Sequence, residues 1–141
     1  MEFDGGRADM KRVLVVMAAV LVAGCDSGVV GASATTGTYP LRSINGESLP
    51  YTISGSGSSK TEVVDDKFIL YEGNTYQESG TLRVTVNGTA STTAISETGS
   101  YGTLGTSMTF TNSAGTRQRV ALGDGSRITI VENGLSYVYR K

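Results

Sequence analysis

The feature that most constrains the fold of this chain is a period-two alternation of apolar and polar residues, which begins near Gly37 and runs to the C-terminus. Turns that contain glycine interrupt it about every 8–12 residues, a spacing typical of antiparallel β structure, and helical periodicity is missing. We predict strands at residues 38–45, 49–54, 61–71, 75–86, 89–98, 100–104, 107–112, 116–122, 126–131 and 135–140. We expect about 8–10 of these to form an all-β, up-and-down meander.

Asn-Gly pairs mark the tightest reversals. Both residues tolerate positive φ, so each pair favours the two-residue type I′ turn of a β-hairpin. The pairs are Asn45-Gly46, Asn87-Gly88 and Asn133-Gly134. A two-residue turn at Asn133-Gly134 pairs Ile128 with Tyr139 and Ile130 with Tyr137, and we assign these four side chains to the core face.

The reversal at residues 123–125 determines the face of the strand before it. If these three residues form the loop, Leu122 pairs with Ser126 and Val120 with Ile128, so Val120 and Leu122 are predicted to point inward. The same parity leaves three arginines outside: Arg117, Arg119 and Arg127. We interpret them as a solvated face, and the alternative is a site for an anionic head group or a partner.

The Asn87-Gly88 hairpin suggests room for a ligand. It pairs Leu82 with Thr93 and Val84 with Ser91, so that large apolar side chains lie opposite small hydroxyls. A mixed cavity of this kind suits a small amphiphile such as a fatty acid, with a tyrosine hydroxyl near its polar end. The candidate ligand-binding residues are Leu82, Val84, Ser91, Thr93, Tyr137 and Tyr139.

Two further groups of residues admit both a structural and a functional interpretation. Five tyrosines could line a pocket, but we favour rings that fill the barrel, because eight strands enclose little more than their own side chains. These are Tyr39, Tyr76, Tyr101, Tyr137 and Tyr139. Asp65-Asp66 could be paired carboxylates for acid/base chemistry or calcium binding, but neighbours in a strand point to opposite faces, so we favour a solvated turn.

The first residues have the order of a bacterial lipoprotein signal peptide. Basic Lys11-Arg12 follows Met10, which we interpret as the start, and precedes an apolar run at residues 13–22, about half of the ~20 residues that span a bilayer. Val22-Ala23-Gly24-Cys25 then has the small residues of a processing site. We therefore predict a signal peptide at 1–24, a diacylglycerol-modified Cys25 with a flexible tether at 25–37, and a β domain at 38–141.

Composition excludes several classes of function. The chain has no histidine, and its one cysteine is assigned to lipidation. The usual ligands of zinc, haem and iron–sulfur centres are therefore missing, as is the usual general base, so we predict no metal, no cofactor and no catalytic residues. Charged residues are scattered and the net charge is −1, which indicates no nucleic-acid partner.

Several short motifs are distributed over nearly the whole β domain. They are Gly37-Thr38-Tyr39, Leu41, Asn45-Gly46, Leu49-Pro50-Tyr51, Gly73-Asn74-Thr75-Tyr76, Gly99-Ser100-Tyr101 and Tyr137-Val138-Tyr139-Arg140. The pattern resembles small bacterial lipocalin-like lipoproteins, with Tyr39 at the place of the tryptophan of lipocalins. The resemblance implies a closed or partly closed up-and-down β-barrel.

Together these features predict a non-enzymatic envelope lipoprotein. Acyl chains on Cys25 would hold it on the outer or cytoplasmic membrane, with the domain in the periplasm or at the cell surface. We expect the barrel to bind a small amphiphilic ligand. The alternative is a structural or protein-binding module with a packed barrel and an exposed apolar or arginine-rich patch, whose protein partner the sequence does not identify.

Overall fold

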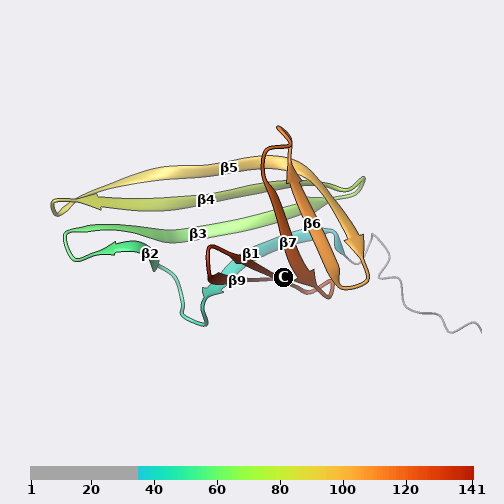
Figure 1. Ribbon diagram of the computed structural model, residues 1–141, viewed down its shortest axis with the longest axis horizontal. Helices are drawn as coiled ribbons and strands as arrows, with labels where there is room; N and C mark the ends of the chain where they lie inside the picture. The colour runs from blue at the N-terminus through green and yellow to red at the C-terminus, as the bar shows by residue number, and fades with distance from the viewer. Residues whose placement is uncertain (1–34) are drawn as a thin grey trace, which may run out of the picture.

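The computed structural model describes residues 35–141, in which nine strands form one antiparallel sheet (Figure 1). They are β1 (Gly37–Ile44), β2 (Tyr51–Ser56), β3 (Ser59–Tyr71), β4 (Thr75–Val86), β5 (Thr89–Leu104), β6 (Ser107–Asn112), β7 (Gln118–Gly123), β8 (Arg127–Glu132) and β9 (Leu135–Arg140). The prediction of an all-β meander is confirmed. The segments predicted at 89–98 and 100–104 are one continuous strand, β5.

β1 closes the sheet into a barrel because it pairs on two sides. Residues 37–40 lie antiparallel to residues 70–67 of β3, and residues 41–44 lie against β9. Eight strands therefore form a closed antiparallel barrel, and β2 is an additional strand that pairs with β3 alone. The eight-stranded arrangement is compatible with a lipocalin-like barrel.

The Asn-Gly turns have the backbone conformation that the sequence predicts. Asn45, Asn87 and Asn133 have φ of 52°, 49° and 52°, and the glycines that follow them have φ of 85°, 81° and 77°. Positive φ at both central residues is the requirement of the type I′ turn. The predicted pairs Ile128–Tyr139 and Ile130–Tyr137 are confirmed as well.

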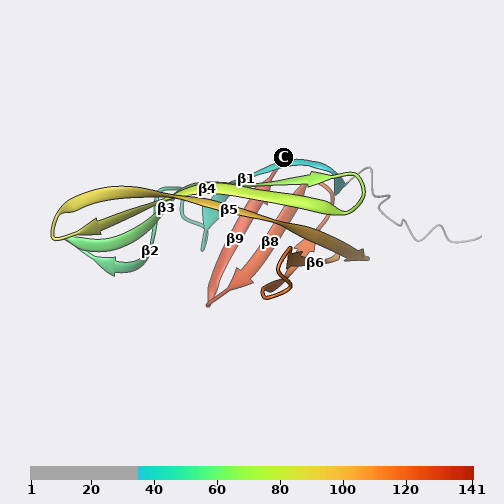
Figure 2. The same ribbon diagram turned by 90° about the horizontal axis from the view of Figure 1, so that it is seen from above.

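Three strands are much longer than the barrel needs. β3, β4 and β5 have 13, 12 and 16 residues, whereas β6, β7, β8 and β9 have six each. β6 covers β5 only from Gly99 onward. The preceding part of β5 and its neighbours therefore extend beyond the barrel (Figures 1 and 2). We call this extension the projecting sheet: β2 with residues 59–65, 80–86 and 89–95.

The projecting sheet contains the hairpin predicted to make room for a ligand. The pairs Leu82–Thr93 and Val84–Ser91 are confirmed. However, Ser91 and Thr93 are exposed, because this part of β5 has no neighbour beyond it. The small hydroxyls therefore face solvent on an extension of the barrel and not its interior.

The predicted faces of β7 are wrong. Gly123 pairs with Ile128 and Ala121 with Ile130, so the loop turns around Gly125 and Ser126 and not around Asp124. The Asp124 carboxylate explains this, since its Oδ1 accepts the N–H groups of Ser126 at 3.0 Å and Arg127 at 2.8 Å. Ile128 therefore pairs with Gly123 instead of the predicted Val120, a register shift of three residues. Because three is an odd number, the shift exchanges the two faces of β7.

The exchange reverses the predicted positions on β7. Ala121 and Arg119 point inward, with Arg119 only 6% exposed. Val120 and Leu122 point outward and are 62% and 63% exposed. Arg127 is exposed, as predicted, and Arg117 is half-buried.

Aromatic rings fill one part of the barrel. The ring centroid of Phe68 lies 5.6 Å from that of Tyr76 and 5.0 Å from those of Phe110 and Tyr139. The other core side chains include Tyr39, Leu41, Ile44, Leu70, Tyr101, Met108, Ile128 and Ile130. The interpretation of the tyrosines as barrel filling is confirmed for Tyr39, Tyr76, Tyr101 and Tyr139, whereas Tyr137 is half-buried.

The predicted signal peptide, Cys25 and residues 25–34 of the tether lie outside the described residues. From Thr35 to the C-terminus, the structure has no helix long and apolar enough to cross a membrane.

Candidate ligand-binding pocket

A cavity of about 240 Å³ lies where the projecting sheet meets the barrel. Its apolar wall combines both parts: Ile53, Val63, Leu82 and Ile95 come from β2, β3, β4 and β5, and Ile130 and Tyr137 come from β8 and β9. Its remaining lining is polar or charged: Asp66, Glu78, Arg117, Arg119, Glu132 and Tyr139. The cavity is therefore amphiphilic.

A bulge in β3 brings the apolar wall and a carboxyl group together. The register of β3 against β4 shifts between Val63 and Asp65. Such a shift inserts an extra residue and re-aims the side chains that follow it. As a result Val63 and Asp66, three positions apart, both line the cavity, although regular alternation would put them on opposite faces.

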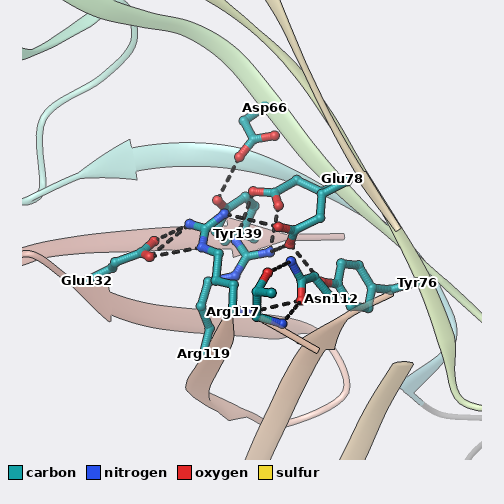
Figure 3. Close-up of polar contacts among 10 residues, drawn as sticks. Asp66, Tyr76, Glu78, Asn112, Arg117, Arg119, Glu132 and Tyr139 are labelled. Carbon is teal, nitrogen blue, oxygen red and sulfur yellow. Dashed lines mark hydrogen bonds and ion pairs between the residues drawn. The ribbon is translucent and has the colours of Figure 1, made fainter. Parts of the chain in front are cut away.

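An ion pair crosses the barrel interior beside the cavity (Figure 3). Arg119 on β7 donates from Nη1 and Nη2 to the two carboxylate oxygens of Glu78 on β4, at 2.9 and 2.6 Å. Its Nη2 also donates to Glu97 on β5 at 2.5 Å. The guanidinium carbon lies 4.9 Å from the ring centroid of Phe68, so this pair rests on the aromatic core.

Arg117 forms a second ion pair nearer the surface. Its Nη2 lies 2.8 and 2.6 Å from the two oxygens of Glu132, and its Nε lies 3.1 Å from Oε1. Its Nη1 donates to Glu97 at 3.4 Å. The backbone N–H groups of Thr116 and Arg117 donate to the side-chain oxygen of Asn112, which fixes the loop before β7.

Asp66 is the most perturbed carboxyl group of the cavity. It is 8% exposed, and it accepts hydrogen bonds from the Tyr139 hydroxyl and from the Lys67 backbone N–H, both at 2.8 Å. Burial and the neighbouring negative charge of Glu78 raise its pKa to about 7, against the lowering effect of these two bonds. Asp66 therefore exchanges a proton near neutral pH.

Three neighbours of Asp66 keep their protonation state near neutral pH: Arg119 and Glu97 stay charged, and Tyr139 stays neutral. Burial opposes the charge of Arg119, but the hydrogen bonds and charge of Glu78 raise its pKa further above the usual range. Burial also opposes ionisation of Glu97, yet Tyr76, Arg119 and Arg117 lower its pKa. Burial raises the pKa of Tyr139 well above its usual value, so its hydroxyl remains a donor to Asp66.

The structure brings together part of the predicted ligand site. Leu82, Tyr137 and Tyr139 line the cavity. Val84, Ser91 and Thr93 are not among its lining residues: Val84 and Ser91 lie farther out on the projecting sheet, and Thr93, the partner of Leu82, is exposed. Asp65-Asp66 does not form the predicted turn, since both residues belong to β3. Their side chains point to opposite faces as expected, with Asp65 exposed and Asp66 buried.

The sequence interpretation missed the charged lining, although a signal for part of it was present. In β4, Glu78 has the same parity as Tyr76 and Leu82, so alternation alone places a carboxylate on the inward face. Asp66 likewise shares its parity with buried Phe68 and Leu70. A charged residue in register with apolar core residues is the signal for a buried ionic group.

Residues 35–141 contain no group of three or more histidine, cysteine, aspartate or glutamate side chains arranged to hold a metal ion. Compared with protein-family models, curated protein sequences and solved structures, the chain shows no significant match.

Proposed function

We propose that this protein is a non-enzymatic, lipid-anchored component of the bacterial cell envelope whose barrel binds a small amphiphilic ligand. The observation that carries the binding function is the cavity between the projecting sheet and the barrel, which joins an apolar wall to a charged end. Pockets for small ligands typically combine a mostly apolar lining with a few placed polar groups.

The size of the cavity limits the ligand. Its volume of about 240 Å³ is below the range of about 300–1,000 Å³ usual for drug-sized ligands. The other part of the barrel is filled by the aromatic core. The ligand is therefore a small molecule, or only one end of a longer chain enters.

The anchoring part of the proposal rests on the sequence of residues 10–25. A basic start, an apolar run and Val22-Ala23-Gly24-Cys25 together provide the signal for diacylglycerol transfer to Cys25. Two or more acyl chains give lasting membrane attachment at ~0.8 kcal/mol per buried CH₂. The protein would then capture its ligand close to a bilayer.

Binding is tested with an uncharged probe, so that the result does not depend on electrostatic attraction between the ligand and the charged end of the cavity. The full chain, purified from membranes and placed in phosphatidylcholine nanodiscs, is titrated with 1-octanol by calorimetry against empty nanodiscs. We expect saturable binding that Leu82→Trp abolishes by filling the cavity. Val120→Trp is the matched control, because Val120 lies on the outer wall. Absence of saturable octanol binding would overturn the ligand-binding proposal.

Anchoring is tested separately. Cys25→Ser removes the thiol that would be acylated, so we expect loss of metabolic palmitate labelling and loss of partitioning into the detergent phase. Ser27→Ala in the tether is the control and should leave both unchanged. Palmitate labelling that persists in Cys25→Ser would overturn the lipid anchor.

A second candidate function is a structural or protein-binding envelope lipoprotein. It is favoured by the packed aromatic core together with apolar side chains on the outer wall of β7 and β8. Val120, Leu122 and Val131 are 62%, 63% and 67% exposed. Exposed apolar patches on a soluble domain often mark protein contacts.

A further inference from the structure

We propose that the cavity selects amphiphiles with a positively charged amine head group over those with a carboxylate head group. The inference rests on the proposed ligand-binding function and specifies the chemistry of the ligand. Two observations support it. Carboxyl groups outnumber arginines at the polar end of the cavity, and these arginines already form ion pairs with carboxylates of the protein.

Carboxyl groups outnumber cations at this end of the cavity. Four carboxyl groups approach it from four strands: Asp66 on β3, Glu78 on β4, Glu97 on β5 and Glu132 on β8. Two guanidiniums face them, those of Arg117 and Arg119. The other titratable groups nearby are the hydroxyls of Tyr76, Tyr137 and Tyr139, which are neutral at physiological pH. With every carboxyl group ionised, the site carries an excess of negative charge.

The arginines are held by these carboxylates. Arg119 makes a bidentate contact with Glu78 and a further bond to Glu97, and both partners are largely buried. Arg117 contacts both oxygens of Glu132. A ligand carboxylate that paired with Arg119 would have to displace Glu78 or Glu97 and leave it largely buried without its cation, which is costly, whereas the Arg117–Glu132 pair is more exposed. A fatty acid is therefore disfavoured as the ligand.

Asp66 is the carboxyl group whose charge no arginine neutralises. In its ionised form it accepts hydrogen bonds from a tyrosine hydroxyl and a backbone N–H, both neutral donors, and a further side-chain hydrogen bond with Glu78 forms only when one of the two carboxyl groups is protonated. A carboxylate offers about four lone-pair positions, so Asp66 retains capacity for another donor. Asp66 lines the cavity together with Val63, which belongs to the apolar wall. An ammonium group at Asp66 would thus place its alkyl chain against the projecting sheet.

The perturbed pKa of Asp66 supports this assignment. In the free protein, a proton on Asp66 near neutral pH relieves the excess of negative charge. A bound ammonium group would provide the same relief and displace that proton. Binding near pH 7 should therefore release protons, which neither a neutral alcohol nor a carboxylate would cause.

The test compares three eight-carbon probes on the full chain in phosphatidylcholine nanodiscs at pH 8, where Asp66 is ionised. These are 1-octanol, octylammonium and octanoate. We expect octylammonium to bind tighter than octanol on the order of tenfold or more, and octanoate to bind more weakly than octanol. Calorimetry at pH 7 in buffers of different ionisation enthalpy should show proton release with octylammonium.

Asp66→Asn keeps the shape of the side chain and removes its charge, so it should reduce the preference for octylammonium over octanol. Glu62→Gln is the matched control. Glu62 is a buried carboxylate of the same strand, but it is paired with Lys60 and Arg83 away from the cavity, and the preference should persist. The proton-release measurement on the unmodified protein remains decisive if Asp66→Asn does not fold.

The possible failures are distinguishable. If octanol binds but octylammonium shows no preference or no proton release, the amine selectivity is overturned while the binding function remains. Tighter binding of octanoate than of octanol would also overturn the selectivity. If none of the three probes binds saturably, the ligand-binding function itself is overturned.

Discussion

Arg119 and Glu78 form a bidentate ion pair across the barrel, with nitrogen–oxygen distances of 2.9 and 2.6 Å. β7 and β4 are not neighbours, because β6 and β5 lie between them in the sheet. The pair therefore links two walls through the interior, in addition to the backbone ladder that links adjacent strands.

Arg119→Met should destabilise the protein strongly. Removing the guanidinium leaves Glu78 and Glu97 buried without their cation, and breaking a buried pair typically costs about 3–5 kcal/mol. Arg127→Met is the matched control, because Arg127 is exposed, and it should change the free energy of unfolding by no more than about 0.5 kcal/mol. Urea unfolding followed by circular dichroism measures both. Equal losses would contradict the interior position of Arg119.

The faces of β7 and β8 predict a second contrast in stability. Ile130 is 2% exposed, so Ile130→Ala should cost about 2–5 kcal/mol through lost burial and the cavity that remains. Val120 is 62% exposed, and Val120→Ala should cost less than about 1 kcal/mol. The same unfolding assay measures both variants. A larger loss from Val120→Ala would restore the register in which residues 123–125 form the loop.

The sequence predicts the elements that depend on local chemistry. Asn133-Gly134 forms a two-residue turn in which both residues have positive φ, and the pairing of β8 with β9 follows directly from this turn. The same holds for Asn87-Gly88 and the pairing of β4 with β5. Alternation then distributes the side chains between two faces, and Ile128, Ile130 and Tyr139 are correctly placed in the core.

The errors arise where the register depends on the geometry of a single side chain. Two glycines flank Asp124, so the sequence permits turns centred on different residues, and the hydrogen bonds of the Asp124 carboxylate select one of them. Because the turn is centred between Gly125 and Ser126 and not on Asp124, Ile128 pairs with Gly123 instead of Val120, and Arg119 lies in the interior and not on the predicted outer face. That misplacement concealed Arg119, whereas Asp66 and Glu78 were missed although the parity of their strands places them on the inward face.

Other parts of the site depend on distant contacts. Arg119 and Glu78 are 41 positions apart, and Tyr139 and Asp66 are 73 apart. Only barrel closure by β1 brings their strands to face one another. Likewise, the sequence predicts long strands at β3 and β4 but divides β5 into two segments, and the extension of these strands beyond the barrel follows from where β6 stops covering β5.

A glycine of β5 gives a third prediction, because the ring of Tyr76 packs over it. A Cβ atom at Gly99 would come closest to the backbone carbonyl oxygen of Thr111, and it would lie 2.8 Å from both the Tyr76 ring and the Cα atom of Asn112, closer than real Cβ contacts allow. Gly99→Ala should therefore cost about 1–3 kcal/mol through overpacking. Gly102→Ala in the same strand meets no atom within 4 Å, so it should be neutral or stabilise by up to about 1 kcal/mol. Thermal unfolding of the two variants tests this, and equal melting temperatures would contradict it.

The last prediction is a loss of stability as pH rises from about 5 to 8. The pKa of Asp66 is about 7 in the folded protein and near 3.8 when the chain is unfolded. Between these values the folded state holds one more proton than the unfolded state, so the free energy of unfolding decreases as pH increases. The contribution is fully present below about pH 3.8 and lost above about pH 7, with a slope of at most roughly 1.4 kcal/mol per pH unit.

Few other groups contribute to the change in stability between pH 5 and 8. The chain has no histidine. The hydrogen bonds of Arg83 and Lys60 lower the pKa of Glu62 to about 2, and the pKa values of Glu97 and Asp124 are also lowered, so their contributions change only in more acidic solution. Urea unfolding between pH 5 and 8 should therefore show the decrease in the unmodified protein and a nearly flat profile in Asp66→Asn. Asp65→Asn, an exposed neighbour, should retain the decrease, and a decrease that survives in Asp66→Asn would assign the proton to another group.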